Sequence, residues 1–319
     1  MTRYVGEFSV RVPASTSNLG AGFDAVGMAV DRWLNVDARI TSRSEAVVLE
    51  RAGALAVLDC ADEDDLIWRG FNVACAALRR TPPTGVEISA TSDIPVGRGL
   101  GSSAAAIVAG VLLANAMLDG DLDATSIVNV AASIDGHPDN VAPSMLGGAV
   151  LSVRTSGHHY SSAPIVVHPS LRFVFLVPDF EVRTSVARAA LPATLPYPTA
   201  VSAVGRAAAL ILGLQTADAS ILAPALDDVL HVPFRRSLIP AYDDVASTAI
   251  AAGAIGATLS GSGSTIVAVA RHDVADRVRD VALNTWRSAG VSAEAFITAA
   301  EPRGAMVDEM RVADGQSRP

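Results

Sequence analysis

Alternating hydrophobic and polar positions predict several short strands in the first half of the chain. Residues 86–91 alternate between apolar and polar side chains, and 8–12 and 36–40 repeat the pattern. A period of two residues is typical of strands with one buried face. Pro13 is expected to end the first strand, because proline cannot donate to a sheet ladder. Apolar stretches without this alternation predict helices over 66–78, 104–117 and 125–134.

The second half of the chain predicts a sheet covered by helices. Apolar runs predict strands at 173–177, 257–259 and 265–270, and alternation predicts a last strand at 293–297. The last four elements have the order strand, strand, helix, strand. This order indicates an α+β domain with a mainly antiparallel sheet. Helices are expected over 184–190, 201–215 and 242–251, and a further one from an N-cap at Asp273 to a stop at Gly290.

Polar, turn-rich residues at 155–159 place a domain boundary there, which predicts domains of 1–155 and 156–319. The tail beyond residue 300 has no periodicity and is expected to fray. The segment 137–143 is expected to be a turn leading to a strand at 148–153.

The overall charge and the apolar runs exclude some classes of partner. A net charge of −9 and the absence of a basic run argue against a nucleic acid. The apolar run 104–118 is interrupted by Gly110 and Asn115 and is too short for a bilayer, which needs roughly 20 residues. Two cysteines, Cys60 and Cys75, fit a reducing compartment. We therefore expect a soluble cytoplasmic protein that binds neither nucleic acid nor membrane.

A glycine-rich segment, IPVGRGLGSSAA, lies between a predicted strand and a predicted helix. Strand, glycine turn and helix start are the arrangement in which backbone N–H groups receive a phosphate. A tight strand-to-helix connection is the alternative explanation of the same glycines. The chain has no lysine, which excludes a Walker P-loop, a protein-kinase site and a Schiff-base lysine.

Four further segments hold polar side chains that could do chemistry. PASTSNLGAGFD, DGHPDNVAP and GATLSGSGST are rich in turn-forming residues, and turns alone could explain them. TSVARAALP and HVPFRRSLIP each place an arginine, Arg188 and Arg235, among apolar neighbours. Most such arginines are solvated surface groups, although a guanidinium is also the best clamp for a carboxylate. No second histidine lies at metal-ligand spacing from His137, which argues against zinc.

Taken in order, three segments resemble the motifs of the GHMP kinase superfamily: PASTSNLGAGFD, IPVGRGLGSSAA and GATLSGSGST. The segments DGHPDNVAP, TSVARAALP and HVPFRRSLIP resemble the homoserine kinase branch. The resemblance extends from residue 10 to about residue 270. It implies a two-domain α+β fold, with an N-terminal domain like ribosomal protein S5 domain 2 and a ferredoxin-like C-terminal domain.

The resemblance also implies a reaction and its cofactors. The γ-phosphoryl group of ATP would pass, with Mg²⁺, to the side-chain hydroxyl of L-homoserine in threonine biosynthesis, in a homodimeric enzyme. The nucleotide would be bound by Pro95, Val96, Gly97, Arg98, Gly99, Leu100, Gly101, Ser102, Ser103 and Ala104. Mg²⁺ would be held by Ser103 and Asp135. The amino acid would be surrounded by Asn18, Asp24, His137, Asn140, Thr184, Arg188, Arg235 and Gly261.

The sequence leaves more than one candidate for the proton acceptor and for the substrate. Asp139 is the candidate base, together with Asn140 and Ser103 as catalytic residues, but Asn140 could face the hydroxyl while the proton passes directly to phosphate. Another small alcohol, such as mevalonate or shikimate, is the alternative substrate. Asp135 stands where many relatives have Glu, which leaves a non-catalytic ATP or amino-acid sensor as a second alternative.

Overall fold

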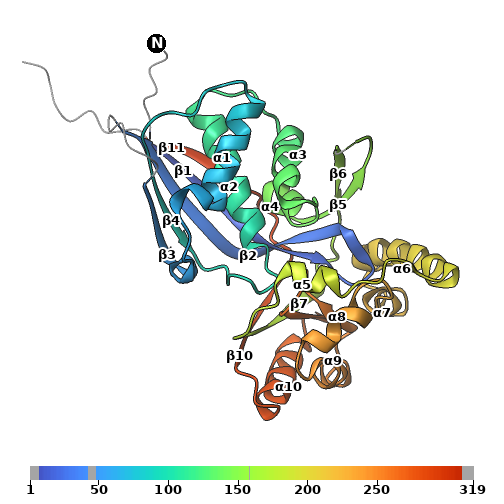
Figure 1. Cartoon of the computed structure of the whole chain (residues 1–319). Helices are drawn as coiled ribbons and strands as arrows, with labels where there is room; N and C mark the ends of the chain where they lie inside the picture. Colours follow the sequence, from blue (N-terminus) through green and yellow to red (C-terminus); the bar gives the residue numbers. More distant parts are fainter. Residues whose placement is uncertain (1–6, 42–47, 158, 311–319) are drawn as a thin grey trace, which may run out of the picture.

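The computed structural model describes residues 7–41, 48–157 and 159–310 and contains two β-sheets with helices packed against both (Figure 1). The first sheet has seven strands in the order β11-β1-β2-β4-β3, and β5 joins it through β2 and carries β6 at its other side. The strands are β1 (Glu7–Asn18), β2 (Gly22–Ile40), β3 (Val48–Gly53), β4 (Val86–Ser92), β5 (Ala149–Arg154), β6 (Tyr160–Ile165) and β11 (Met306–Met310).

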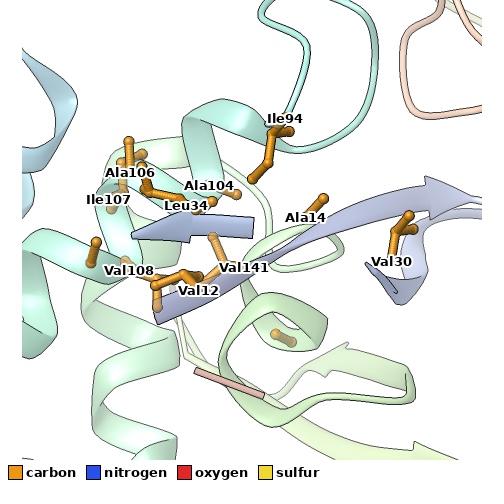
Figure 2. Close-up of a cluster of buried hydrophobic side chains, with 14 of the residues drawn as sticks. Val12, Ala14, Val30, Leu34, Ile94, Ala104, Ala106, Ile107, Val108 and Val141 are labelled. Carbon is orange, nitrogen blue, oxygen red and sulfur yellow. The ribbon is translucent and has the colours of Figure 1, made fainter. Parts of the chain in front are cut away.

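Four helices cover one face of the first sheet: α1 (Leu66–Ala77), α2 (Ser102–Met117), α3 (Ala124–Asp135) and α4 (Val141–Leu146). Helix α2 is apolar on every side, and it is buried over most of its length between β1, α1 and α3. A helix that is apolar all round has to be buried in a core. Figure 2 shows its side chains meeting those of β1 and β2, among them Val108, Val12 and Leu34. The glycine-rich segment is thus attached to the most deeply buried helix of this half.

The second sheet has the antiparallel strand order β10-β7-β9-β8. Its strands are β7 (Leu171–Pro178), β8 (Gly256–Leu259), β9 (Ile266–Arg271) and β10 (Ala293–Thr298). The helices of this half are α5 (Thr184–Ala189), α6 (Tyr197–Thr216), α7 (Ala219–Leu226), α8 (Val232–Arg235), α9 (Tyr242–Ala251) and α10 (Ala275–Ser288). Short 3₁₀ turns occur at Ala54–Val57, Asp62–Asp64 and Arg236–Leu238.

Both faces of the second sheet are buried, and each face belongs to a different core. Val174 and Leu176 of β7 pack in a cluster with residues of α9 and α10, such as Trp286. Phe173 and Phe175 point the other way, into the large cluster that also contains the first sheet. Because successive side chains of a strand face opposite sides, one strand joins the two halves of the molecule into a single packed body.

Most of the predicted elements are confirmed, and four details are wrong. Pro13 does not end the first strand; β1 continues to Asn18 with a register shift at Pro13/Ala14, where a bulge tolerates the missing N–H. The segment 137–143 is not only a turn, because α4 begins within it. Helix α10 begins after Val274 without a side-chain cap from Asp273.

The tail does not fray over 306–310, because these residues form β11 and pair with β1. An edge strand offers a free row of backbone groups, so pairing there needs no strong periodicity. Like β11, β6 lies beyond residue 155 and hydrogen-bonds to the first sheet. The division into domains at that residue stays a prediction.

Among the described residues, one helix, α6, is long and apolar enough by length and composition to cross a membrane, and 22% of its most apolar window is buried. A single helix of this kind is weak evidence for a span, since helices of soluble proteins pass the same test. Its exposed side includes Tyr197, Val201, Val204 and Leu212.

Helices α1 and α2 approach each other through two glycines, and this contact can be tested. A Cβ at Gly110 would lie 1.9 Å from the carbonyl oxygen of Ile67, and one at Gly70 would lie 2.4 Å from that of Ile107. We expect Gly110→Ala to lower the free energy of unfolding by about 2 kcal/mol, because overpacking a core costs about 1–3 kcal/mol. Chemical denaturation measures the change.

The matched control is Gly205→Ala in α6, where an added Cβ meets no atom within 4 Å. There the better helix propensity of alanine should raise stability by about 0.5–1 kcal/mol. Equal stabilisation by both substitutions would contradict the close packing of α1 on α2.

Candidate active site

A cavity of about 510 Å³ lies where the two halves of the molecule meet. Its walls come from the end of β1, the glycine-rich segment, the turn after α3, and residues 181–188, with Arg235 and Gly261 completing them. Small-molecule sites have volumes of about 300–1,000 Å³. The cavity therefore has the size of a ligand site and a lining that combines apolar with polar side chains.

The glycine-rich segment has the backbone conformation of an anion cradle. Gly97, Gly99 and Gly101 have φ values of 70°, 74° and 67°, a region that side chains disfavour. Gly101 caps α2 without any side-chain hydrogen bond, and the first turn of α2 holds no acidic residue. The first N–H groups of a helix have no intrahelical partner, so they and the helix dipole are available to a phosphate.

Two other segments hold this loop from behind. A Cβ at Gly99 would lie 2.2 Å from the carbonyl oxygen of Ser260, and one at Gly101 would lie 2.1 Å from Oγ of Ser15. The Ser260 hydroxyl donates to the carbonyl of Gly99 at 2.6 Å. The backbone N–H of Ser15 donates to Leu100 at 3.2 Å. The glycines are thus required by packing as well as by φ.

The side chain of Arg98 lies away from the position expected of a phosphate ligand. Its guanidinium donates to the carbonyls of Pro178 and Asp179, at 3.0 and 2.7 Å, and to that of Val96 at 3.1 Å. Pro178 ends β7 of the second sheet. Arg98 therefore links the loop to the other half of the molecule, and it is not among the residues that line the cavity.

Asp135, the last residue of α3, has one carboxylate oxygen without a hydrogen-bond partner. Its Oδ1 accepts from Ser103 Oγ at 3.4 Å, whereas Oδ2 is buried and makes no hydrogen bond. Burial raises the pKa of this carboxyl, against the opposing charge of His137. An orphaned buried oxygen beside a hydroxyl at a helix N-terminus is a donor set that suits Mg²⁺. The residues present therefore fit a magnesium ion.

His137 is held between two carboxylates. Its Nδ1 is hydrogen-bonded to Oδ1 of Asp139 and lies 3.8 Å from Oδ2 of Asp135. Burial lowers the pKa of His137, but the hydrogen bond and charge of Asp139 and the charge of Asp135 outweigh it and raise the pKa to about 9. His137 is therefore a cation at neutral pH. Ligand atoms of Asp24, His137 and Asp139 also lie within 4.8 Å of one another.

The two asparagines predicted to contact substrate have their amides engaged by the protein. Asn140 accepts from Ser15 Oγ and donates to Ser17 Oγ, both at 3.1 Å. Asn18, which is 3% exposed, donates to the carbonyl of Gly261 at 2.8 Å and accepts from the N–H of Asp24 at 3.0 Å. Both side chains line the cavity while they brace its walls.

Asp24 and Arg188 form an ion pair across the cavity. The two guanidinium nitrogens of Arg188 donate to the two carboxylate oxygens of Asp24 at 2.8 and 3.2 Å. The hydrogen bond to Asp24 raises the pKa of Arg188, against its partial burial. Asp24 belongs to β2 and Arg188 to α5, so the pair connects the two halves. Thr184, one turn before Arg188, faces Ser262 at 3.4 Å.

Arg235 is a deeply buried cation in the cavity wall, with 2% exposure. Its guanidinium donates to the carbonyl of Ala187 at 3.1 Å and to that of Gly261 at 3.5 Å. Burial lowers the pKa of Arg235, and the nearby charge of Arg188 lowers it further. A guanidinium stays protonated in proteins, so Arg235 keeps its positive charge in the cavity wall.

Profiles of protein families match both halves of the chain. The profile described as GHMP kinases N terminal domain matches residues 65–148, and the one described as GHMP kinases C terminal matches residues 203–288. A homoserine kinase of Gloeobacter violaceus is 40% identical over 300 residues, which are 94% of this chain and 98% of that protein. The chain belongs to the homoserine kinase family of the GHMP kinases. The homoserine kinase of Nostoc punctiforme is 36% identical over 302 residues.

Solved structures agree with this assignment. A homoserine kinase from Cytophaga hutchinsonii superposes with a TM-score of 0.85 at 29% identity. The superposition covers 97% of this chain and 99% of the Cytophaga chain. The phosphomevalonate kinase of Streptococcus pneumoniae has a TM-score of 0.67 at 10% identity and shares the fold alone. The predicted two-domain GHMP kinase fold is therefore confirmed.

The fold of this GHMP kinase brings the predicted site residues around one cavity. Asn18, Asp24, His137 and Asp139 lie with Arg188 and Arg235 in its wall, and the glycine-rich segment forms another wall. Pro95, Arg98 and Ala104 do not belong to the cavity lining, although they flank residues that do. The roles assigned to individual residues stay predictions.

Several lining residues of this GHMP kinase were missed from the sequence. Leu55, Leu58, Cys60 and Leu66 form an apolar end of the cavity. Glu181 and Ser262 line it beside Gly97 and Thr184. No motif spacing distinguishes such residues, because they come together only when separate loops meet.

Asp65 lies at the apolar end of the same cavity. Its carboxylate accepts from the N–H of Ile67 at the start of α1 and pairs with Arg51 at 2.8 Å. Asp65 therefore holds α1 in place and neutralises a buried arginine.

The contact of Gly99 with Ser260 gives a test of the loop. We expect Gly99→Ala to weaken ATP binding roughly tenfold, because the added Cβ would push the loop away from Ser260 and a lost hydrogen bond to a charged group costs about 1.5–3 kcal/mol. Isothermal titration with ATP and Mg²⁺ measures the dissociation constant. Gly290→Ala is the control, since Gly290 has a φ of 79° but no atom within 4 Å of an added Cβ. Equal ATP affinity in the two variants would contradict the packing argument.

Proposed function

We propose that this chain is an ATP-dependent kinase that phosphorylates the side-chain hydroxyl of L-homoserine in threonine biosynthesis. The observation that carries the proposal is the paired opposite charge of Asp24 and Arg188 beside an anion cradle, in a member of the homoserine kinase family. A zwitterionic substrate offers an ammonium to the carboxylate and a carboxylate to the guanidinium. When it binds, the substrate can therefore replace the ion pair between Asp24 and Arg188 with two ion pairs, one between its ammonium and Asp24 and one between its carboxylate and Arg188.

The substrate carboxylate is proposed to lie between Arg188 and Arg235, and the ammonium beside Asp24. A carboxylate bound by guanidinium donors forms charge-assisted hydrogen bonds, about twice as strong as neutral ones. His137, Asn140, Thr184 and Gly261 complete this pocket in the proposal, all of them in the cavity wall.

The triphosphate is proposed to lie along the backbone of residues 97–104, at the N-terminus of α2. Ser103 and Asp135 would hold Mg²⁺, which when bound neutralises charge on the phosphates. Without any lysine, the protein supplies the remaining stabilisation through backbone N–H groups and the helix dipole. The apolar end of the cavity, with Leu55 and Leu58, is proposed to receive the adenine ring.

Asp139, Asn140 and Ser103 are the proposed catalytic residues. Asp139 is 1% exposed, and its carboxylate is hydrogen-bonded to His137. In this proposal, the proton of the substrate hydroxyl passes to the Asp139 carboxylate, next to the His137 ring. In the alternative route the hydroxyl proton passes directly to the phosphate, and the carboxylate then orients His137. We further propose a cytoplasmic homodimer, on the resemblance to the family.

The reaction is tested by measuring ADP release with ATP and Mg²⁺ against L-homoserine, L-serine, mevalonate and shikimate. We expect turnover confined to L-homoserine and abolished by excess EDTA, because only this substrate has the ammonium, the carboxylate and the reach of its hydroxyl together. Turnover of mevalonate or shikimate instead would refute the substrate. ATP binding without turnover of any acceptor would support a sensor.

The role of Asp24 predicts a selective defect. Asp24→Asn should raise the KM for L-homoserine roughly tenfold and leave the KM for ATP within about twofold, since a hydrogen bond to a charged group contributes about 1.5–3 kcal/mol. Asp243→Asn is the matched control, because Asp243 pairs with Arg236 at 3.0 Å on the surface. Unchanged homoserine kinetics in Asp24→Asn would remove this residue from the pocket.

A further inference from the structure

Arg235 has its guanidinium held on two sides and open on a third. Its Nε donates to Ala187, and its Nη1 lies 3.3 Å from Nδ1 of His231 and 3.5 Å from the carbonyl of Gly261. Among the described residues, Nη2 makes no hydrogen bond within the protein, and Arg235 lines the cavity. The partners of Nε and Nη1 therefore fix the direction in which Nη2, the nitrogen that remains for a ligand, points.

The contact between Arg235 and His231 fixes the tautomer of the imidazole. A guanidinium can only donate, so Nδ1 of His231 must accept and cannot carry a proton. The ring proton then lies on Nε2, which donates to the carbonyl of Gly20 at 3.3 Å. Burial lowers the pKa of His231 and the charge of Arg235 lowers it further, while Asp228 acts in the opposite direction. His231 is a neutral acceptor for the buried guanidinium.

The segment that holds His231 is fixed by Asp228, whose side chain is fully buried. The Asp228 carboxylate accepts from the backbone N–H groups of Leu230, His231 and Val232, at 3.0, 2.6 and 2.8 Å. Three hydrogen bonds to one carboxylate leave the backbone at His231 little freedom. The imidazole is thus presented to Arg235 from a rigid turn.

The other support is Phe23, which lies next to Asp24 in the sequence. Its ring stacks on the His231 imidazole with centroids 4.9 Å apart and planes inclined by 18°. The guanidinium of Arg235 lies 5.2 Å from the same ring, and that of Arg188 lies 5.9 Å from it. One aromatic ring therefore contacts both proposed carboxylate-binding arginines and the imidazole.

We propose that His231 is a positioning residue, whose unprotonated Nδ1 holds the Arg235 guanidinium in the orientation that binds the substrate carboxylate. This inference rests on the proposed function. In a buried histidine that only fills the core, the unprotonated ring nitrogen would accept a hydrogen bond from the backbone or from solvent. Here Nδ1 of His231 accepts from the charged guanidinium in the cavity wall, and that contact connects Asp228, His231 and Arg235 to the ligand.

The first experiment compares His231→Leu and His231→Asn with the wild-type enzyme, using L-homoserine and ATP. We expect His231→Leu to lower kcat/KM for homoserine roughly tenfold or more through KM, with the KM for ATP within about twofold. His231→Asn should recover most of the loss, because its Oδ1 can accept near the position of Nδ1. Equal losses toward homoserine and ATP would overturn the proposal.

A double-mutant cycle with Arg235→Ala separates positioning from general destabilisation. If His231 acts through Arg235, His231→Leu should cost less than about twofold in kcat/KM when Arg235 is already alanine. Equal cost in both backgrounds would show independent effects and overturn the proposal. If the wild-type enzyme did not turn over homoserine, the proposed function would be refuted instead. The tautomer of His231, measured by NMR, would still test the inference.

The tautomer can be measured without any turnover. Long-range ¹H–¹⁵N NMR on the wild-type protein, with His231 assigned by its loss in His231→Asn, should show an unprotonated Nδ1 and a protonated Nε2 at pH 7. A proton on Nδ1 would overturn the proposal, since that nitrogen could not accept from Arg235. This measurement also decides the matter if His231→Leu does not fold.

Discussion

Close backbone packing between three glycine-containing segments is the constraint on which the site depends. The carbonyl of Gly99 receives the Ser260 hydroxyl, and Gly261 is bound on both sides of its peptide by Ser17 and Asn18. A side chain at Gly99 would occupy the place of the Ser260 backbone. The glycine-rich segment is therefore shaped by both halves of the molecule, and the N-terminus of α2 is held where these halves meet.

The charges of the cavity follow from this packing. Asp24 follows the turn that Asn18 braces, and Arg188 and Arg235 come from the other half, so opposite charges meet across the junction. Buried charges are costly unless paired. Arg235 is placed among carbonyl oxygens and a neutral imidazole, while one oxygen of Asp135 accepts no hydrogen bond from the described residues. The site thus carries unsatisfied polar groups of both signs, which a charged ligand and a cation can satisfy.

Much of this was predictable from the sequence, for identifiable reasons. Alternation located β4, which has one buried face, and continuous apolar runs located β7 and α2, which are buried on more than one side. The edge strand β11 was missed, since its pairing with β1 needs only a free backbone edge. The continuation of β1 past Pro13 was missed because a bulge absorbs the proline. The use of Arg98 as a link between the halves was also invisible, since it depends on carbonyls that face it only in the folded chain.

The sequence by itself determined the family, the glycine cradle and the set of charged residues, because these are local patterns of residue type and spacing. The tertiary structure decided which polar atoms remain available. It engaged the amides of Asn18 and Asn140 in the walls of the cavity. Within the part of the chain that the structure describes, it left Oδ2 of Asp135 and Nη2 of Arg235 without a hydrogen-bond partner. It also placed His231 behind Arg235. Hydrogen-bond partners are assigned by proximity in space, and residues far apart in the chain acquire that proximity only when the two sheets pack together.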